Sequence, residues 1–410
     1  MKDRVYSAPG RFRLSVSESA AYPARSHMTQ LPILYFVSLL MDLSVAGVTF
    51  AISRRAAELG ASASQLGWLG AVWIGVYAVV ALIMGRYSDR VGRRKLAIIG
   101  CLISGSMAFV CSLTTQIGWL LLFSAIFGCG LACFWPSIIA WLGEGLRGHK
   151  LAVRLTAFGV AWNLGLLLGF LLSGLLFKQG PKLAFYASAS SILLIAVLLL
   201  LPAKQLENNN NGSSDSDLAP HIPQGRGFRK TAWLANFATN FALAGTTALF
   251  PQLAMHLGIS ADVHGALLAA GRGAALLAFI ALQLLAFWRT RLWPLWAAQL
   301  LCAASLVWIG LSNTTWMFAA AWIVGGIVSG YAYQASIYFT LEEMTEKGKG
   351  SGFHEAIIGS GMFVGPVLAG WVGSRHSLRA PYFFCASVLV LLIAVQMALV
   401  WTRRHSGATA

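Results

Sequence analysis

Residues 64–95 read SQLGWLGAVWIGVYAVVALIMGRYSDRVGRRK, an apolar run that ends in a strongly basic stretch. A helix of about 20 apolar residues crosses a lipid bilayer, so residues 64–84 predict a transmembrane helix. The same pattern of apolar runs and short charged breaks continues along the chain. Of its 410 residues, 57% are hydrophobic and 11% are charged, whereas about 25% of the residues of a soluble domain are charged. Lipid is therefore the expected solvent of this chain.

Twelve apolar runs are long enough to span a membrane, which predicts an all-α integral membrane protein. The predicted spans are 31–52, 64–84, 96–115, 117–142, 151–177, 182–202, 231–255, 263–287, 293–312, 315–341, 352–373 and 381–401. The longest break is rich in asparagine and serine, a composition that cannot bury a core. We therefore predict a cytoplasmic tail at 1–30, a six-helix bundle at 31–202, a flexible cytoplasmic linker at 203–230, a second six-helix bundle at 231–401 and a cytoplasmic tail at 402–410.

The two sets of six helices repeat each other in sequence. Ala46-Gly47-x-Thr49 and Leu59-Gly60-x-Ser62 return 198 residues later as Ala244-Gly245-x-Thr247 and Leu257-Gly258-x-Ser260. Gly165-x-x-x-Gly169 returns 196 residues later as Gly361-x-x-x-Gly365. Several matches at nearly one offset predict a parallel duplication. Because each unit holds an even number of spans, both units enter the membrane from the same side.

The net charge of +16 is high enough to consider nucleic acid as a partner. The basic residues argue against it, because they lie between the apolar runs and form no basic face along any one segment. Most of the 30 lysines and arginines fall on the side of the membrane that holds the N-terminus. The loops on the other side hold Arg54, Arg55, Lys178, Lys182, Arg375 and Arg379. This bias predicts a cell (inner) membrane protein with both termini in the cytoplasm.

The basic stretch after the second span reads Gly85-Arg-Tyr-Ser-Asp89-Arg90-Val-Gly92-Arg93-Arg94-Lys95. It resembles the signature loop of the major facilitator superfamily, Gly-x-x-x-Asp-basic-x-Gly-basic-basic, at every defined position. The resemblance extends to the helix count, the linker position and the duplication. It implies transport, a substrate site between the two halves, and a role for Asp89 at the N-terminus of helix eleven, where a negative charge meets the positive end of the helix dipole. The alternative for the arginines is a solvated loop that holds topology.

The fifth predicted helix resembles the antiporter motif of the same family, whose pattern is Gly-x-x-x-Gly-Pro-x-x-Gly-Gly. It holds Gly165, Gly169 and Gly174, but Phe170 replaces the proline and Ser173 a glycine. The eleventh helix holds Gly361, Gly365, Pro366 and Gly370. The pattern is closest to the drug/metabolite:proton antiporter branch. The departures weaken that assignment, as does Ser124, which stands where the proton antiporters carry an arginine. Close helix packing is an equally good explanation of these small residues.

Ionisable side chains inside a membrane are costly and usually functional. Asp42 lies near the centre of the first span, and Arg272 near the centre of the eighth. We expect function to depend on this pair, with a purely structural pair as the alternative. Asp42 would respond to protons, and Arg272 would attract anionic groups of a substrate. His354 and Glu355, about one turn into helix eleven, are further candidates for proton coupling.

Polar and aromatic residues recur on single faces of several predicted helices. The resemblance implies that helices one, four, seven and ten line a central cavity. On these and adjoining helices, the candidate cavity residues are Asp42, Trp135, Asn163, Asn236, Asn240, Arg272, Tyr331, Gln334 and Tyr338. Each single polar residue has an alternative role in an interhelical hydrogen bond. The mixed aromatic, amide and charged lining suits a small organic molecule.

No GxxxxGK[ST] nucleotide-binding loop occurs, which argues against an ATP-driven pump. The six cysteines show no CxxC spacing. We therefore expect no cofactor, no metal and no catalytic residues. The leading hypothesis is a monomeric secondary transporter that exports a small organic solute in exchange for protons. The alternatives are an uptake symporter and a receptor or scaffold that uses the same fold without transport.

Overall fold

The computed structural model describes residues 30–143, 148–201, 228–285, 287–344 and 347–406. This part of the chain forms twelve α-helices and one short 3₁₀-helix, and it contains no strand. The helices of the N-terminal half are α1 (Gln30–Glu58), α2 (Ala63–Val91), α3 (Arg93–Cys111), α4 (Ile117–Leu142), α5 (Gly148–Gln179) and α6 (Pro181–Leu200). Those of the C-terminal half are α7 (Arg229–His256), α8 (Ala261–Leu284), η2 (Phe287–Thr290), α9 (Trp293–Leu311), α10 (Thr315–Glu343), α11 (Lys347–Arg375) and α12 (Ala380–Ser406).

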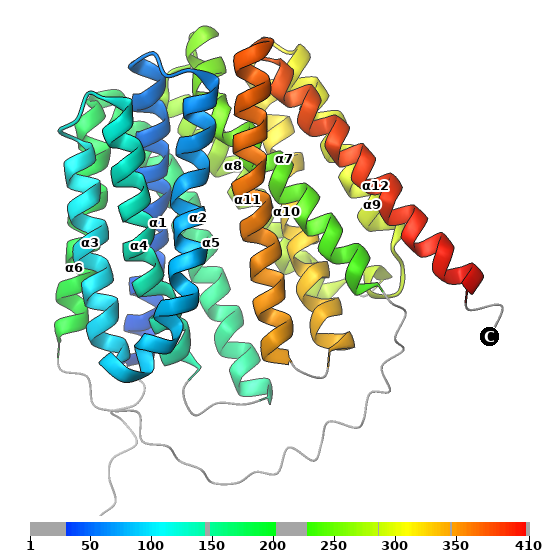
Figure 1. Ribbon diagram of the computed structural model, residues 1–410, viewed down its shortest axis with the longest axis horizontal. Coiled ribbons are helices and arrows are strands. Elements are labelled where there is room, and N and C mark those ends of the chain that lie inside the picture. The colour runs from blue at the N-terminus through cyan, green and yellow to red at the C-terminus, as the bar shows by residue number, and fades with distance from the viewer. Residues whose placement is uncertain (1–29, 144–147, 202–227, 286, 345–346, 407–410) are drawn as a thin grey trace, which may run out of the picture.

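The helices run side by side, with the N-terminal half on the left and the C-terminal half on the right of Figure 1. We call the end where α1 begins and α12 ends the basal end, and the opposite end the distal end. Because both halves contain six helices, α6 ends and α7 begins at the basal end as well. This is the arrangement that the predicted duplication requires.

Eleven of the described helices are long and apolar enough to cross a membrane. The twelfth, α7, is long enough but carries several polar residues, including Asn236, Thr239 and Asn240. Within lipid every backbone polar group needs a partner inside the protein, and a helix supplies it within the segment. The predicted all-α membrane fold is confirmed, and the polar α7 is the helix whose surroundings most need explanation.

The duplication is visible in the ends of equivalent helices. Gly60 and Gly258 both adopt positive φ, 78° and 68°, just after α1 and α7. The N–H of Ala61 donates to the carbonyl of Ala56 over 2.9 Å, and the N–H of Ile259 to that of Ala254 over 2.8 Å. A left-handed glycine followed by this backward bond is a common way to end a helix. Both halves therefore end their first helix in the same way.

Glycines set the contacts within each half in matching pairs. A Cβ added to Gly165 of α5 would lie 3.1 Å from the Cβ of Asp42 on α1, and one added to Gly361 of α11 would lie 3.1 Å from the Cβ of Asn240 on α7. Helix α5 packs against α1, and α11 against α7. Small residues four apart allow such close approach in a membrane. The predicted packing role of these glycines has a direct geometric basis.

The boundaries of several predicted helices differ from the observed ones, as α2 and α11 illustrate. Residues 85–91 were expected in a loop but continue α2, and Gly92 alone, with φ of 97°, makes the turn before α3 begins at Arg93. Only glycine adopts this conformation without strain. Helix α11 begins at Lys347, earlier than the predicted Gly352. Polar residues at helix ends do not interrupt a helix where water can solvate them, so hydropathy alone places these ends too close to the membrane centre.

Candidate functional site

Asp42 and Arg272 come from opposite halves and lie in the interior of the bundle. Asp42 on α1 is 3% exposed, and its Oδ2 has no hydrogen-bond partner. Arg272 on α8 is partly exposed. Each lies within electrostatic range of the other, but not within the 4 Å of an ion pair. The structure therefore places the two predicted charges within electrostatic range of each other, across the boundary between the halves, but not in direct contact.

Helix α7 carries Asn240 at the position equivalent to Asp42 on α1, with Asn236 one turn before it. The Asn240 side-chain N–H₂ donates to both the backbone and the side-chain oxygen of Asn236, each over 2.9 Å. Asn236 is fully buried, and its own Nδ2 has no partner among the described groups. Because Asn240 is equivalent to Asp42, the two halves place an amide and a carboxyl at corresponding depths. Only the N-terminal half carries a charge there.

Helix α11 carries His354 and Glu355 on different faces. His354 is fully buried, and its Nδ1 lies 2.8 Å from the Oγ of Ser336 on α10. Glu355 is exposed, yet it lies within electrostatic range of Tyr77 on α2 and Tyr333 on α10. An exposed carboxyl between tyrosines of opposite halves borders the space between those halves. His354 packs within the C-terminal half, whereas Glu355 faces the other half.

Open space adjoins Glu355 on the same side of the bundle. A Cβ added to Gly359, one turn beyond Glu355, would meet no atom within 4 Å. The same holds for Gly159 of α5, which is equivalent to Glu355 in the register that aligns Gly165 with Gly361. Both glycines lie between the tight inter-half contacts and the basal end. The two halves are therefore less tightly packed there than at the distal end.

The predicted cavity residues of α10 point in different directions. Tyr331 and Tyr338 both pack against Trp288 of η2, with ring centroids 6.0 and 5.1 Å apart. That contact lies inside the C-terminal half and does not support the predicted cavity role of these two tyrosines. Gln334 is 8% exposed. Tyr333, on the other side of the helix, contacts His354 with ring centroids 4.8 Å apart.

Trp135 and Asn163 lie within the N-terminal half. Each is 8% exposed. The Trp135 ring packs against that of Phe158 at 5.8 Å, and the Asn163 side chain donates to the carbonyl of Gly159 over 2.9 Å. Asn163 thus uses a donor within its own helix. Its place beside the open position at Gly159 is consistent with the predicted cavity role, which stays a prediction.

Three residues that face the boundary between the halves were missed by the sequence analysis. Trp162 of α5 and Tyr333 of α10 approach across this boundary, with ring centroids 6.5 Å apart. Tyr77 of α2 lies within electrostatic range of both Asp42 and Glu355. The repeat offers no signal for Trp162, because the equivalent position of α11 holds Ile358. No motif in the sequence singles out Tyr77 or Tyr333 either.

The structure describes the side chains of only part of the signature motif. Gly85, Asp89 and Arg90 lie in α2, but their side chains are outside the described part of the structure. Arg93 donates to the carbonyl of Ala140 over 3.0 Å, and Arg94 to that of Leu201 over 2.7 Å. These carbonyls lie at the ends of α4 and α6, where cations are favourable. Both arginines therefore fasten the basal end of the N-terminal half.

At the distal end the two halves are joined tightly. Lys178 of α5 forms an ion pair with Asp262 of α8 at 2.8 Å. The Arg54 guanidinium donates to the carbonyl of Ile259 over 3.0 Å. On the other side, the backbone N–H of Ser64 donates to the Oγ of Ser374 over 2.7 Å. The first contact joins α5 to α8 and the third joins α2 to α11, whereas Arg54 joins α1 to the connection between α7 and α8. The structure is closed at its distal end.

The glycines predicted for packing take part in the same closure. Gly174 lies against Gly265 of α8, and Gly370 against Gly67 of α2, with an added Cβ 2.9 and 3.0 Å from the facing Cα atoms. Pro366 of α11 places its backbone beside Gly67. The two contacts are equivalent in the repeat, so the halves meet in the same way on both sides of the distal end. Neither glycine could be replaced by a larger residue without separating the helices.

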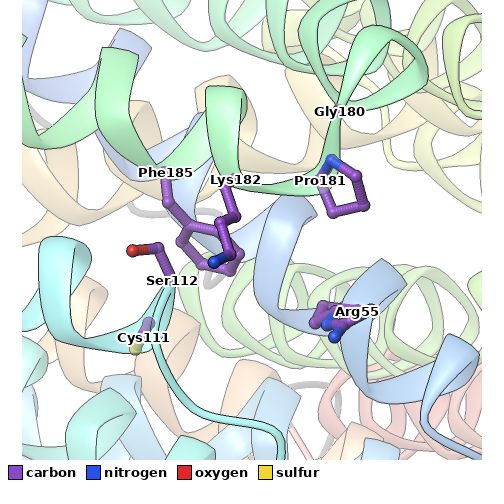
Figure 2. A pocket seen from close by; sticks show the side chains of 7 residues that line it. All are labelled: Arg55, Cys111, Ser112, Gly180, Pro181, Lys182 and Phe185. Atoms are coloured by element: carbon purple, nitrogen blue, oxygen red, sulfur yellow. The ribbon is translucent and has the colours of Figure 1, made fainter.

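A separate cavity of about 390 Å³ lies at the distal end within the N-terminal half, and Figure 2 shows the side chains that line it. Its lining residues are Arg55, Cys111, Ser112, Gly180, Pro181, Lys182 and Phe185. Its lining includes none of Asp42, Arg272, His354 and Glu355. No group of three or more metal-ligating side chains occurs in the part of the chain that the structure describes.

A model of the Major Facilitator Superfamily matches residues 34–347 and 232–409, so the chain belongs to this family. The 4-hydroxybenzoate transporter PcaK of Acinetobacter baylyi is 24% identical over 152 residues, which are 37% of this chain and 33% of that protein. Synaptic vesicle glycoprotein 2B of Rattus norvegicus is 31% identical over 137 residues, 32% of this chain and 20% of that protein. The chain thus matches a third or less of the length of these relatives.

Among solved structures, a bacterial homolog of the human lysosomal transporter Spinster, in an inward-facing and occupied conformation, superimposes with a TM-score of 0.73. The two chains are 16% identical, and the match covers 93% of this chain and 98% of that one. At this identity the likeness shows the fold. It confirms the predicted twelve-helix architecture, whereas the predicted family is confirmed by the family model.

Proposed function

We propose that this chain is a secondary active transporter that moves a small organic solute by alternating access, with proton-coupled efflux as its mode. The observation that supports this most directly is the pair Asp42 and Arg272. These charges come from opposite halves and lie within electrostatic range in the interior. A charge at mid-membrane costs about 2.5–3.5 kcal/mol even on the most lenient scale, so its retention argues for a function.

In the proposed cycle, the distal end and the basal end of the bundle close alternately. In the described state the distal end is held by the Lys178–Asp262 ion pair and the paired glycine contacts. With the basal end in the cytoplasm, as the charge distribution predicts, this state is inward-facing. Opening the distal end requires these contacts to break and the halves to approach at the basal end. Substrate sites between two such repeats are reached alternately from the two sides.

Protons would enter the cycle through Asp42. When its carboxyl is ionised, attraction between Asp42 and Arg272 draws α1 and α8 together across the boundary. Protonation removes that attraction and leaves Arg272 free to turn toward a substrate or water. A ligand shifts a conformational equilibrium only through its different affinity for the two states. Proton binding to one member of an inter-half pair supplies such a difference. His354 and Glu355 remain alternative proton carriers.

The proposal describes a transporter and not an enzyme. One experiment distinguishes proton-coupled efflux from its two alternatives, an uptake symporter and a receptor or scaffold. The purified protein is reconstituted into liposomes with an imposed pH gradient, and a panel of organic solutes is screened for flux that depends on the gradient. The panel includes 4-hydroxybenzoate, because a relative transports it. Flux against the proton gradient supports exchange, and flux along it supports an uptake symporter. Absence of flux for every solute in the panel, with the protein correctly inserted, would favour a receptor or scaffold.

A further inference from the structure

Glu355 is the interior carboxylate that the Asp42–Arg272 pair does not balance. Of the described interior charges, Arg272 acts on Asp42, and no described cation lies within 4 Å of Glu355. Glu355 is exposed, in contrast to its fully buried neighbour His354. An accessible carboxylate without a described counter-charge, about one turn inside the span Gly352–Arg375, favours a positively charged partner. Of Asp42, Arg272 and Glu355, the carboxylate on α11 is therefore the charge without a described counter-charge.

Aromatic rings from both halves surround the same region. Tyr333 is within electrostatic range of Glu355, and so is Tyr77 of the opposite half. Trp162 adds a third ring, 6.5 Å from Tyr333 between centroids. The face of an aromatic ring attracts cations, most strongly where water is excluded. Rings beside a single carboxylate form the combination that binds substituted ammonium groups.

Open space is present where a ligand would have to fit. Gly359, on the next turn after Glu355, faces a region in which an added Cβ would meet no atom within 4 Å. The equivalent of Glu355 in the other half is Gly159, which also faces open space. The duplication has thus placed a carboxylate at one of two equivalent positions and a glycine at the other. Both positions lie on the less tightly packed basal side of the boundary between the halves.

We propose that Glu355, with Tyr77, Tyr333 and Trp162, forms a binding site for an organic cation that carries an aromatic or other apolar group. The proposal rests on the transporter function proposed above and assigns its substrate class. The carboxylate fixes the charged group of the ligand, and the rings hold the ammonium and the apolar part. The site contrasts with an anion site at Arg272, for which an acidic solute would be the ligand. The two possibilities predict opposite ligand charges, a cation at Glu355 and an anion at Arg272.

The test is a direct binding measurement on the full-length protein in lipid nanodiscs. The probe is tritiated benzyltrimethylammonium, whose permanent charge does not vary with pH, and phenylacetate serves as the anion of similar size. The wild type is expected to bind the cation saturably, with no competition from phenylacetate. Glu355→Gln is expected to weaken binding at least tenfold. The matched control is Glu58→Gln, which removes a distal carboxylate paired with Arg55 and leaves binding within twofold.

A second pair of variants tests the rings without removing charge. Tyr333→Phe keeps the aromatic face and is expected to bind like the wild type, whereas Tyr333→Leu is expected to bind several times more weakly. Thermal unfolding of each variant shows whether it is folded. Absence of saturable cation binding by the wild type, equal binding by Glu355→Gln, or competition by phenylacetate would each overturn the proposal.

The outcomes separate this proposal from the transporter function. Proton-linked flux of some solute in liposomes, without cation binding in nanodiscs, would retain the transporter and remove the cation site. Cation binding that depends on Glu355, without flux of any solute, would retain the site and remove transport.

Discussion

Asp42 is the residue on which the proposed proton coupling depends. The change Asp42→Asn keeps the size of the side chain and removes its charge. We expect this variant to bind substrate but to lose the pH dependence of binding and transport. The measurement is solute binding and flux across a range of pH in nanodiscs and liposomes. Full proton-driven transport by Asp42→Asn would remove this carboxyl from the mechanism and leave it a buried hydrogen-bonding group.

The same pair makes a prediction about folding. Arg272→Gln leaves Asp42 without the only described cation within its electrostatic range, so this variant is expected to be less stable than the wild type. Asp42→Asn together with Arg272→Gln removes both charges and is expected to recover stability. Thermal unfolding of the purified variants provides the comparison. Equal stability of the single and double variants would show that the two charges do not stabilise each other.

Glycines provide a second prediction at the level of single residues. A Cβ at Gly165 would lie 3.1 Å from both the Cβ of Asp42 and the backbone nitrogen of Leu43. Overpacking of this kind typically costs about 1–3 kcal/mol. Gly165→Ala is therefore expected to lower the unfolding temperature, whereas Gly159→Ala on the same helix, which faces open space, is expected to leave it unchanged. If both variants unfold alike, the close contact between α1 and α5 does not contribute to stability.

The sequence shows clearly which interior residues carry a charge. It shows less well which side chains of one helix lie on the same face. Asp42, Arg272 and Glu355 stand out because ionisable residues are rare in membrane spans. Tyrosines are not rare, and three on α10 follow patterns compatible with a cavity. The structure shows that Tyr331 and Tyr338 pack on Trp288 while Tyr333 approaches Trp162. Packing against η2 decides between these faces, and that short helix follows the predicted eighth span, where hydropathy gives no sign of it.

At the scale of helices, the signature motif combines a turn with two arginines that bind the ends of other helices. Gly92 provides the left-handed turn, and Arg93 and Arg94 hold the ends of α4 and α6. The predicted role of Asp89 at the start of α11 is separate from these contacts. Charge–dipole contacts contribute about 0.3–1 kcal/mol when exposed. We expect Asp89→Asn to shift the population toward the inward-open state and slow turnover, measured by labelling of cysteines placed near the distal end. Unchanged labelling would count against this role.

The distal contact between α2 and α11 provides a way to hold the described state. The N–H of Ser64 lies 2.7 Å from the Oγ of Ser374, which is close enough for a disulfide between cysteines at these positions. We expect oxidation of the double variant Ser64→Cys, Ser374→Cys to stop transport, and reduction to restore it. The single variants should not respond to the oxidant. Full transport by a protein shown to be cross-linked would mean that this contact does not open.

At the scale of the whole molecule, the duplication explains why the two halves can exchange their contacts. The α2–α11 and α5–α8 contacts are equivalent, with Gly370 facing Gly67 and Gly174 facing Gly265. Equivalent interfaces on both sides allow the halves to rock about the boundary without losing their internal packing. The sequence predicted this duplication well, because it is written in glycine spacings. It did not predict which end is closed, since both states share the same helices.

The final prediction concerns the orientation of the whole molecule in its membrane. The basic residues at the basal end predict that both termini lie in the cytoplasm. A reporter enzyme that is active only outside the cytoplasm, fused after Ala410, is therefore expected to be silent. The same reporter placed after Thr114, in the distal connection between α3 and α4, is expected to be active. An active fusion after Ala410 and a silent one after Thr114 would invert the molecule. The described state, closed at its distal end, would then be outward-facing instead of inward-facing.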